Sequence, residues 1–328
     1  MSQILKGFEG PLFYLLLAAY VLATLLYWGG ALGKKNGLSR AATWVTVAGL
    51  VINTVTVGVR MLIAHRPPLA NGYEFILTFC WGIVAVYLFA EFRYRLRALG
   101  SFVLPVPALL LLFVEIAISP AERSSTAIMP ALKSQWLTIH VATAMLAYGA
   151  FAVSFGLGVM YLLKERKIRV TGRVGGPVPG APGDAERETM SAAESSATGS
   201  LLAGSELSNG ADEVNGGVLA RFPALEVLDE LAYKVVAFGF PLLTLCIITG
   251  AVWANYTWGT YWSWDPKETW SLITWLVYAG YLHVRFTRGW KGRPAAWLAV
   301  LGFAAVLFTF FGVNYFLPGL HSYANPGG

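Results

Sequence analysis

Hydrophobic residues fall into eight long stretches along this chain, separated by short polar connections and by one long polar segment. A helix needs about 20 predominantly apolar residues to cross a bilayer. The stretches lie at 11–32, 41–64, 73–90, 101–118, 135–163, 229–254, 268–286 and 295–317. Because backbone polar groups in lipid must be satisfied within the segment, each stretch is most simply a helix. The pattern predicts an all-α, polytopic membrane protein with about eight transmembrane helices.

The long polar segment divides the predicted helices into a group of five and a group of three. Residues 170–228 are dominated by Gly, Ala, Ser, Pro and Glu. Such a composition cannot bury enough apolar surface to offset the entropy lost on ordering. We therefore predict three parts, which are helices one to five over 1–163, a disordered cytoplasmic linker over 164–228, and helices six to eight over 229–328 with a loop at 255–270.

Composition and charge agree with a membrane protein that contacts lipid. Hydrophobic residues make up 56% of the chain and charged residues 13%, with a net charge of +6. In a soluble protein this charge would suggest nucleic acid, but here the basic residues cluster after alternate predicted helices, so we expect no nucleic-acid partner. The positive-inside rule places these clusters in the cytoplasm, and both termini and the loop at 255–270 outside it. The clusters are Lys34, Lys35 and Arg40; Arg93, Arg95 and Arg97; Lys164, Arg166, Lys167, Arg169 and Arg173; and Arg285, Arg288, Lys291 and Arg293.

Several common chemistries find no motif in the sequence. The two cysteines, Cys80 and Cys246, each fall inside a predicted helix, and no Cys-x-x-Cys occurs, which argues against disulfide exchange. The lack of Cys-x-x-Cys-His argues against haem attached covalently to this chain. Neither a Walker loop nor a dinucleotide glycine fingerprint occurs, which argues against the use of ATP or NAD.

The connection before the seventh predicted helix is unusually rich in tryptophan. It reads Trp258-Gly-Thr-Tyr-Trp-Ser-Trp-Asp-Pro-Lys-Glu-Thr-Trp270 and holds four of the chain's 12 tryptophans. Tryptophan often anchors a membrane protein at the interface, but anchoring requires neither this density nor two nearby acids. A flat array of indoles with a few polar groups suits a large planar, largely apolar ligand. The candidate platform residues are Trp258, Tyr261, Trp262, Trp264, Asp265, Glu268 and Trp270.

The two carboxylates in this loop allow two interpretations. Asp265 precedes Pro266, and Glu268 falls in the first turn expected for the seventh helix. Asp265 can cap that helix with Pro266 at its first position, and the helix dipole favours Glu268 there. The alternative is a functional role, in which the carboxylates orient a ligand or partner at the edge of the platform.

Two of the chain's four histidines are predicted at the level of this loop. His140 lies near the outer end of the fifth predicted helix, and His321 follows the last one. Ionisable residues are costly within a membrane and are candidates for function, although a neutral imidazole bonded to a backbone carbonyl is the alternative. Two imidazoles beside an aromatic platform could bind a haem iron from opposite faces. Zinc is the rival, but a closed zinc site needs a full tetrahedral set of ligands.

The other two histidines are predicted elsewhere. His283 follows Glu268 by 15 residues, which places it about 22 Å deeper along a helix. It is therefore too far to share the outer site, and is either structural, a single ligand, or half of a site completed by another subunit. His65 is predicted outside, in a structural or peripheral role, although it could gate or assist the outer site.

These residues resemble the CcsA (ResC) family of system II cytochrome c biogenesis proteins, which handle haem. The tryptophan-rich loop matches the family's WWD region almost throughout, as far as Trp275. His140 and His321 resemble the paired outer haem ligands, and His283 resembles the ligand within the membrane. The segment Pro68-Leu-Ala-Asn-Gly-Tyr-Glu-Phe75 resembles the family's Pro-x-Ser-Asn-x-Tyr-Glu-Ser element, with Ala70 and Phe75 in place of serines.

The resemblance implies a cytochrome c haem-lyase (synthase) subunit that works with a CcsB (ResB) partner in a plasma (inner) or thylakoid-type membrane. Haem b would be its non-covalently bound substrate, entering from the cytoplasmic side at His283, where the partner would supply a second histidine. The WWD loop would present this haem outside to reduced apocytochrome c, whose Cys-x-x-Cys-His thiols attack the vinyl groups. We assign no residue of this chain as a catalytic acid or base.

Two other functions fit some of the same features. A haem exporter or chaperone without ligation activity would use the same ligands, so the residues do not distinguish it from a synthase subunit. An electron-transfer subunit with permanent haem b would need histidines paired within helices at matching depth, and the sequence lacks such a pair.

Overall fold

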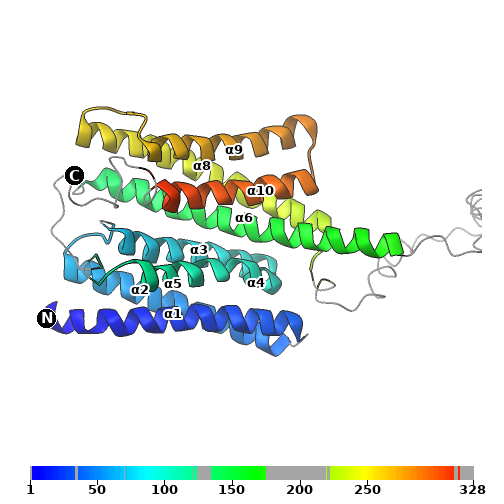
Figure 1. Cartoon of the computed structure of the whole chain (residues 1–328), viewed down its shortest axis with the longest axis horizontal. Helices are drawn as coiled ribbons and strands as arrows, with labels where there is room; N and C mark the ends of the chain where they lie inside the picture. Colours follow the sequence, from blue (N-terminus) through cyan, green and yellow to red (C-terminus); the bar gives the residue numbers. More distant parts are fainter. Residues whose placement is uncertain are drawn as a thin grey trace, which may run out of the picture. The chain divides into compact units, whose positions relative to one another are not determined.

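The structure is a computed structural model that describes residues 2–33, 36–69, 71–120, 122–123, 134–174, 219, 222–313 and 317. It divides into a first unit, Met1–Leu162 with Ala224–Gly328, and a second unit, Leu163–Pro223. Throughout the described residues the regular structure is helical, which confirms the all-α prediction (Figure 1). The helices are α1 (Ser2–Leu32), α2 (Asn36–Ala64), α3 (Gly72–Tyr94), η1 (Arg97–Leu99), α4 (Gly100–Val103), α5 (Pro105–Ala117), α6 (Gln135–Val174), α8 (Leu225–Trp258), α9 (Pro266–Arg288), α10 (Arg293–Leu307) and a π-helical turn, η4 (Phe308–Gly312).

This chain is a multi-pass membrane protein. In the described part of the chain, seven helical segments are long and apolar enough to cross a membrane. The eighth predicted span corresponds to α9, whose 23 residues make a helix about 35 Å long, but which carries more polar side chains than the others. The expected orientation, with both termini outside the cytoplasm, stays a prediction.

The structure differs from the predicted spans at two places. The fourth stretch is not one helix, because η1, α4 and α5 follow one another with Pro105 at the start of α5, where its missing N–H is tolerated. Ordered helix also enters both ends of the segment predicted as a linker, since α6 continues to Val174 and α8 begins at Leu225. An ion pair between Glu165 and Arg169, 2.7 Å apart, stabilises that part of α6. The rest of the predicted linker, 175–218 and 220–221, lies outside the described residues.

Helix α6 packs closely against helices from both halves of the first unit, and Figure 1 shows it running between them. A Cβ atom added to Gly149 would lie 2.6 Å from the carbonyl oxygen of Gly82 on α3. One added to Gly239 of α8 would lie 3.0 Å from Ala150, and one added to Gly158 would lie 2.9 Å from the Ala296 carbonyl of α10. Small residues allow helix backbones to approach in this way within a membrane. The helix that carries His140 is therefore held rigidly by α3, α8 and α10.

Buried ionic contacts also fix the helix ends. Asp229 at the start of α8 lies 2.8 Å from Arg285 near the end of α9 and accepts the Gly292 N–H at the start of α10. On α3, the buried carboxylate of Glu91 accepts hydrogen bonds from the hydroxyls of Tyr27 and Thr43. Charges are costly in a low-dielectric interior unless they are paired and hydrogen-bonded, and these carboxylates are.

Candidate functional site

The WWD loop, which we define as residues 258–270, is built on the start of α9. Asp265 is the N-cap of α9, with its carboxylate accepting the Lys267 N–H at 3.0 Å and Pro266 in the first helical position. Glu268 completes the capping box by accepting the Asp265 N–H at 3.3 Å, and it also accepts the Ser263 N–H at 2.7 Å. The capping interpretation of the two carboxylates is therefore confirmed. Both hold the loop's backbone in place.

Replacing Glu268 with glutamine should loosen this loop without unfolding the protein. The amide of glutamine keeps one acceptor but loses the negative charge that the N-terminal end of α9 favours, and N-terminal caps contribute about 1 kcal/mol. We expect faster amide exchange over residues 259–268, measured by hydrogen–deuterium exchange, with unchanged exchange in α3. Exchange in the loop equal to that of the wild type would show that Glu268 does not restrain it.

Three aromatic residues of the loop lie toward its surface. The side chains of Tyr261 and Trp264 are 61% and 69% exposed, and Trp262 is half-buried between them. The rings of Trp262 and Trp264 lie 5.9 Å apart at an angle of 89°. The expectation of a flat array is therefore wrong for this pair, which adopts the edge-to-face arrangement that ring quadrupoles favour over a face-to-face sandwich.

Trp264 also has an unusual backbone conformation. Its φ of 60° lies in the left-handed region, which is unfavourable for a bulky side chain and persists only where the surroundings enforce it. The capping box on the next residue supplies that constraint. The Trp264 side chain is exposed in this conformation.

The other two tryptophans of the loop pack inward. The Trp258 ring contacts Trp253 of α8 at 6.1 Å and 74°, and its buried indole N–H has no hydrogen-bond partner in the described part of the chain. Trp270 packs against Phe308 of the π-helical turn at a centroid distance of 4.1 Å. These two residues anchor the ends of the loop, while Tyr261, Trp262 and Trp264 lie toward its surface.

The side chain of His140 packs against α8, where it contacts the carbonyl of Cys246 and the backbone at Gly250. Its Nδ1 lies 2.7 Å from the carbonyl oxygen of Cys246. Because a carbonyl only accepts, Nδ1 carries the proton in this contact, and the neutral form of the ring then has its lone pair on Nε2. A Cβ atom at Gly250 would lie 2.7 Å from Nδ1 and 2.8 Å from Cε1, so the ring rests directly on the α8 backbone. Histidines that bind metals usually donate their second nitrogen to a carboxylate or carbonyl in this way.

A buried apolar cluster joins His140 to the loop and to a third segment. Its core is Leu69, Leu137, Val141 and Trp253, with Phe75, Met145 and Trp258 packed against it. Leu137 and Val141 are neighbours of His140 on α6, while Trp253 and Trp258 lead into the WWD loop. Lys267, in the first turn of α9, places its Nζ 5.9 Å from the centre of the Phe75 ring. The segment from 66 to 75 thus contacts both elements of the predicted site.

The structure places His140 somewhat below the loop rather than beside it. Gly250 precedes Trp258 by eight residues, which corresponds to about 12 Å along α8. The exposed ring of His283 lies near the far end of α9, in agreement with the expected separation from the outer site. His65 is exposed after the end of α2 with a φ of 52°. His321 lies outside the described residues, among which no group of three or more His, Cys, Asp or Glu side chains could hold a metal ion.

Sequence reasoning missed Gly250, Lys267 and Trp253. Lys267 lies within the WWD loop, but a lysine between two acidic residues is typical of a solvent-exposed charge. Its contact with Phe75 was therefore not expected. Gly250 and Trp253 could not be recognised, because their contacts join α6 to α8 across more than a hundred residues.

The comparisons with known proteins agree on one family. A family model described as "Cytochrome C assembly protein" matches residues 69–321. A protein named cytochrome c biogenesis protein CcsA from Gloeobacter violaceus is 40% identical over 315 residues, covering 93% of each chain. The protein of the same name from Pyropia yezoensis is 37% identical, covering 92% of this chain and 93% of its own. The chain belongs to the CcsA family.

The fold of this CcsA-family chain also resembles a solved structure. The chain matches cytochrome c heme lyase CcmF with a TM-score of 0.61 and 17% sequence identity, over 95% of this chain and 47% of that one. This chain therefore spans about half the length of that protein, and the likeness concerns the fold alone. The family match begins at Leu69 and ends at His321. It thus includes the apolar cluster, the WWD loop and the three histidines predicted as ligands.

Proposed function

We propose that this CcsA-family chain is the haem-handling subunit of a cytochrome c synthase, a role in cytochrome c biogenesis. The observation that carries the proposal is His140, whose Nδ1–H is bound to the Cys246 carbonyl while the surrounding apolar cluster reaches the WWD loop. This orientation directs the lone pair of the neutral ring to Nε2, as haem ligation requires. Relatives named for cytochrome c biogenesis support the assignment.

In this proposal haem b is the substrate and is bound without covalent bonds. His140 and His321 bind the iron axially, and Tyr261, Trp262 and Trp264 contact the porphyrin. The loop itself is fixed by the packing of Trp258 and Trp270 and by the helix cap of Asp265 and Glu268. The positive-inside rule places the site on the outer face, and the family resemblance implies a plasma (inner) or thylakoid-type membrane.

The chemical step is the addition of two thiols to the two vinyl groups of haem. In each addition the sulfur of an apocytochrome Cys-x-x-Cys-His motif bonds to one vinyl carbon and a proton is added to the other. The addition therefore needs no oxidant or reductant. The reactive thiolate comes from the client protein, and the synthase holds porphyrin and peptide in attack geometry, an effect that can contribute about 7–11 kcal/mol.

A second haem position is proposed at His283. The ring is exposed on α9 near the end opposite the WWD loop. Because this imidazole is exposed, a second haem ligand could reach it from another subunit. We propose that a CcsB-type membrane partner supplies that ligand, and that haem passes from this position to the outer one.

A haem exporter or chaperone is the second candidate, and the geometry of the loop is compatible with it. Asp265 and Glu268, the carboxylates of the loop, both serve the helix cap, so the loop offers binding and orientation rather than a base. A carrier would need the same binding site.

Co-expression with a CcsB-type partner and a Cys-x-x-Cys-His reporter separates the two candidates. The host must lack its own maturation system, and the measurement is haem that stays on the reporter after denaturation. Covalent haem that requires this chain would establish a synthase subunit. Haem that copurifies with a well-assembled pair without reaching the reporter would favour the carrier and contradict the proposed ligation.

A further inference from the structure

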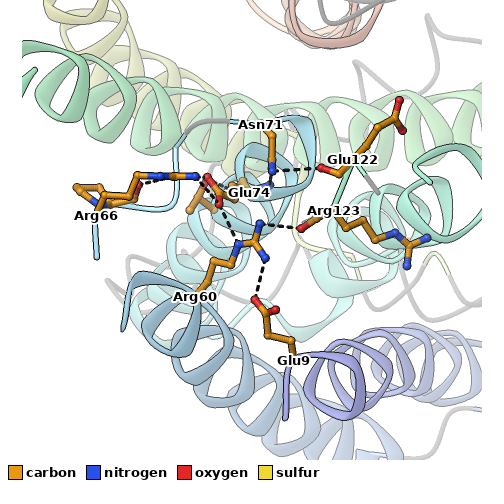
Figure 2. A network of polar contacts seen from close by, with 9 residues as sticks. Glu9, Arg60, Arg66, Asn71, Glu74, Glu122 and Arg123 are labelled. Atoms are coloured by element: carbon orange, nitrogen blue, oxygen red, sulfur yellow. Dashed lines mark hydrogen bonds and ion pairs between the residues drawn. The ribbon is translucent and has the colours of Figure 1, made fainter. Parts of the chain in front are cut away.

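A buried ionic cluster lies beside the apolar cluster of the site, centred on Glu74 in the first turn of α3 (Figure 2). The Glu74 side chain is fully buried and pairs with two arginines. Arg60 Nε lies 2.9 Å from one carboxylate oxygen, and a terminal nitrogen of Arg66 lies 2.7 Å from the other. A buried carboxylate bound by two guanidinium groups strongly constrains their positions.

The same cluster joins the ends of four helices. Arg60, near the end of α2, also binds the carboxylate of Glu9 on α1 at 2.8 Å and the carbonyl of Arg123 after α5 at 2.7 Å. Its three donor nitrogens therefore bind three different acceptors. Asn71 caps α3 by accepting the Glu74 N–H at 2.9 Å, and its amide donates to the Glu122 carbonyl (Figure 2).

The short segment held by these contacts is the one that reaches the proposed haem site. Arg66 and Glu74 bracket it, and Leu69 and Phe75 pack into the apolar cluster with the neighbours of His140 and with Trp253. The Phe75 ring also lies under the Nζ of Lys267, in the first turn of α9. Through Leu69 and Phe75 this segment packs into the cluster beside His140 and contacts Lys267 of the WWD loop.

We propose that Glu74 is a positioning residue, whose pairing with Arg60 and Arg66 sets the spacing between His140 and the WWD loop. This inference rests on the proposed function of that site. Removal of the Glu74 charge takes from the largely buried Arg66 the carboxylate that it pairs with and leaves Arg60 with Glu9 alone, which is unfavourable. Arg66 must then turn toward water, and the segment that follows it, with Leu69 and Phe75, moves with it. The haem ligand and the aromatic loop then lose their common support.

The test compares Glu74→Gln with Glu91→Gln, two isosteric changes on the same helix. Glu91 is also buried and hydrogen-bonded, but it lies 17 residues along α3 from Glu74, about 25 Å away. Both variants lose a buried charge, so both should lower thermal stability. Only Glu74→Gln should alter the optical and electron paramagnetic resonance spectra of bound haem and reduce covalent attachment by about 100-fold, as expected for a small misplacement of reacting groups. Glu91→Gln should stay within about twofold of the wild type, because distant sites act independently.

Hydrogen–deuterium exchange gives a readout that does not depend on haem. Glu74→Gln should speed exchange over 66–75 and over the WWD loop, and Glu91→Gln should not. Wild-type haem spectra and attachment in a folded Glu74→Gln protein would overturn the proposal, as would unchanged exchange in the WWD loop. If the wild type itself attaches no haem, the proposed function fails, while the exchange comparison still decides whether Glu74 positions the loop.

Discussion

Replacing His140 with asparagine should abolish covalent haem attachment while the protein still folds and inserts. The amide nitrogen of asparagine is bonded to Cγ, as Nδ1 of histidine is, so it can still donate to the Cys246 carbonyl that now accepts from the ring at 2.7 Å. The variant lacks only the outer part of the ring, which carries Nε2. Loss of a second-shell partner alone costs about 10–100-fold in metal affinity, and loss of the ligand itself should exceed that range.

The measurement combines the optical spectrum of the purified protein with covalent haem on the reporter. His65→Asn is the matched control, because His65 is exposed and its φ of 52° suits asparagine. The control should attach haem like the wild type. Full attachment by His140→Asn would show that the ring serves only the hydrogen bond to α8. His140 would then not be a haem ligand in the wild type. His321→Ala tests the second ligand in the same assay and should also abolish attachment.

The sequence predicted the parts of this protein that depend on local patterns. The apolar stretches correspond to helices because the composition of each stretch is sufficient to predict a helix. The cap of α9 is likewise local, because it is formed by the four consecutive residues Asp265-Pro-Lys-Glu268. The break before Pro105 also had a local signal, since proline begins helices and rarely continues them. Each of these features can be recognised without knowing what lies across the bundle.

The arrangement of the site could not be predicted, because it depends on contacts between distant segments. The edge-to-face contact of Trp262 with Trp264 and the left-handed backbone of Trp264 arise only in the folded loop. Two local features of the sequence indicate residues of the Glu74 cluster. Arg60 is a charge inside an apolar stretch, which is expensive and therefore informative. Asn71 precedes Glu74 by three residues, a typical start of a helix. Neither signal identifies the partner.

Replacing Gly250 with alanine should reduce haem binding although residue 250 has no side chain to offer a ligand. The added Cβ would lie 2.7 Å from Nδ1 and 2.8 Å from Cε1 of His140, closer than such atoms can approach. The ring must shift or rotate, because the α8 backbone is packed against α6 and cannot withdraw. Either movement lengthens the bond to the Cys246 carbonyl and turns Nε2 away from its set direction.

The stability change distinguishes this effect from general damage. Alanine in a helix is favoured over glycine by about 0.5–1 kcal/mol, while overpacking costs about 1–3 kcal/mol, so the net loss should be modest. Gly58→Ala on α2 is the matched control, since a Cβ there meets no atom within 4 Å. It should be neutral or slightly stabilising, with a wild-type haem spectrum.

A folded Gly250→Ala protein should instead show an altered spectrum and covalent attachment reduced by about 100-fold, the cost of a small misplacement. This result, together with an unchanged spectrum and attachment in Gly58→Ala, would show that the α8 backbone at Gly250 sets the orientation of the His140 ring. A wild-type spectrum with full attachment would mean that the His140 ring is not held against Gly250 when haem binds. The ligand would then be set by other contacts, because a ring free to avoid the new methyl group is not positioned by this helix.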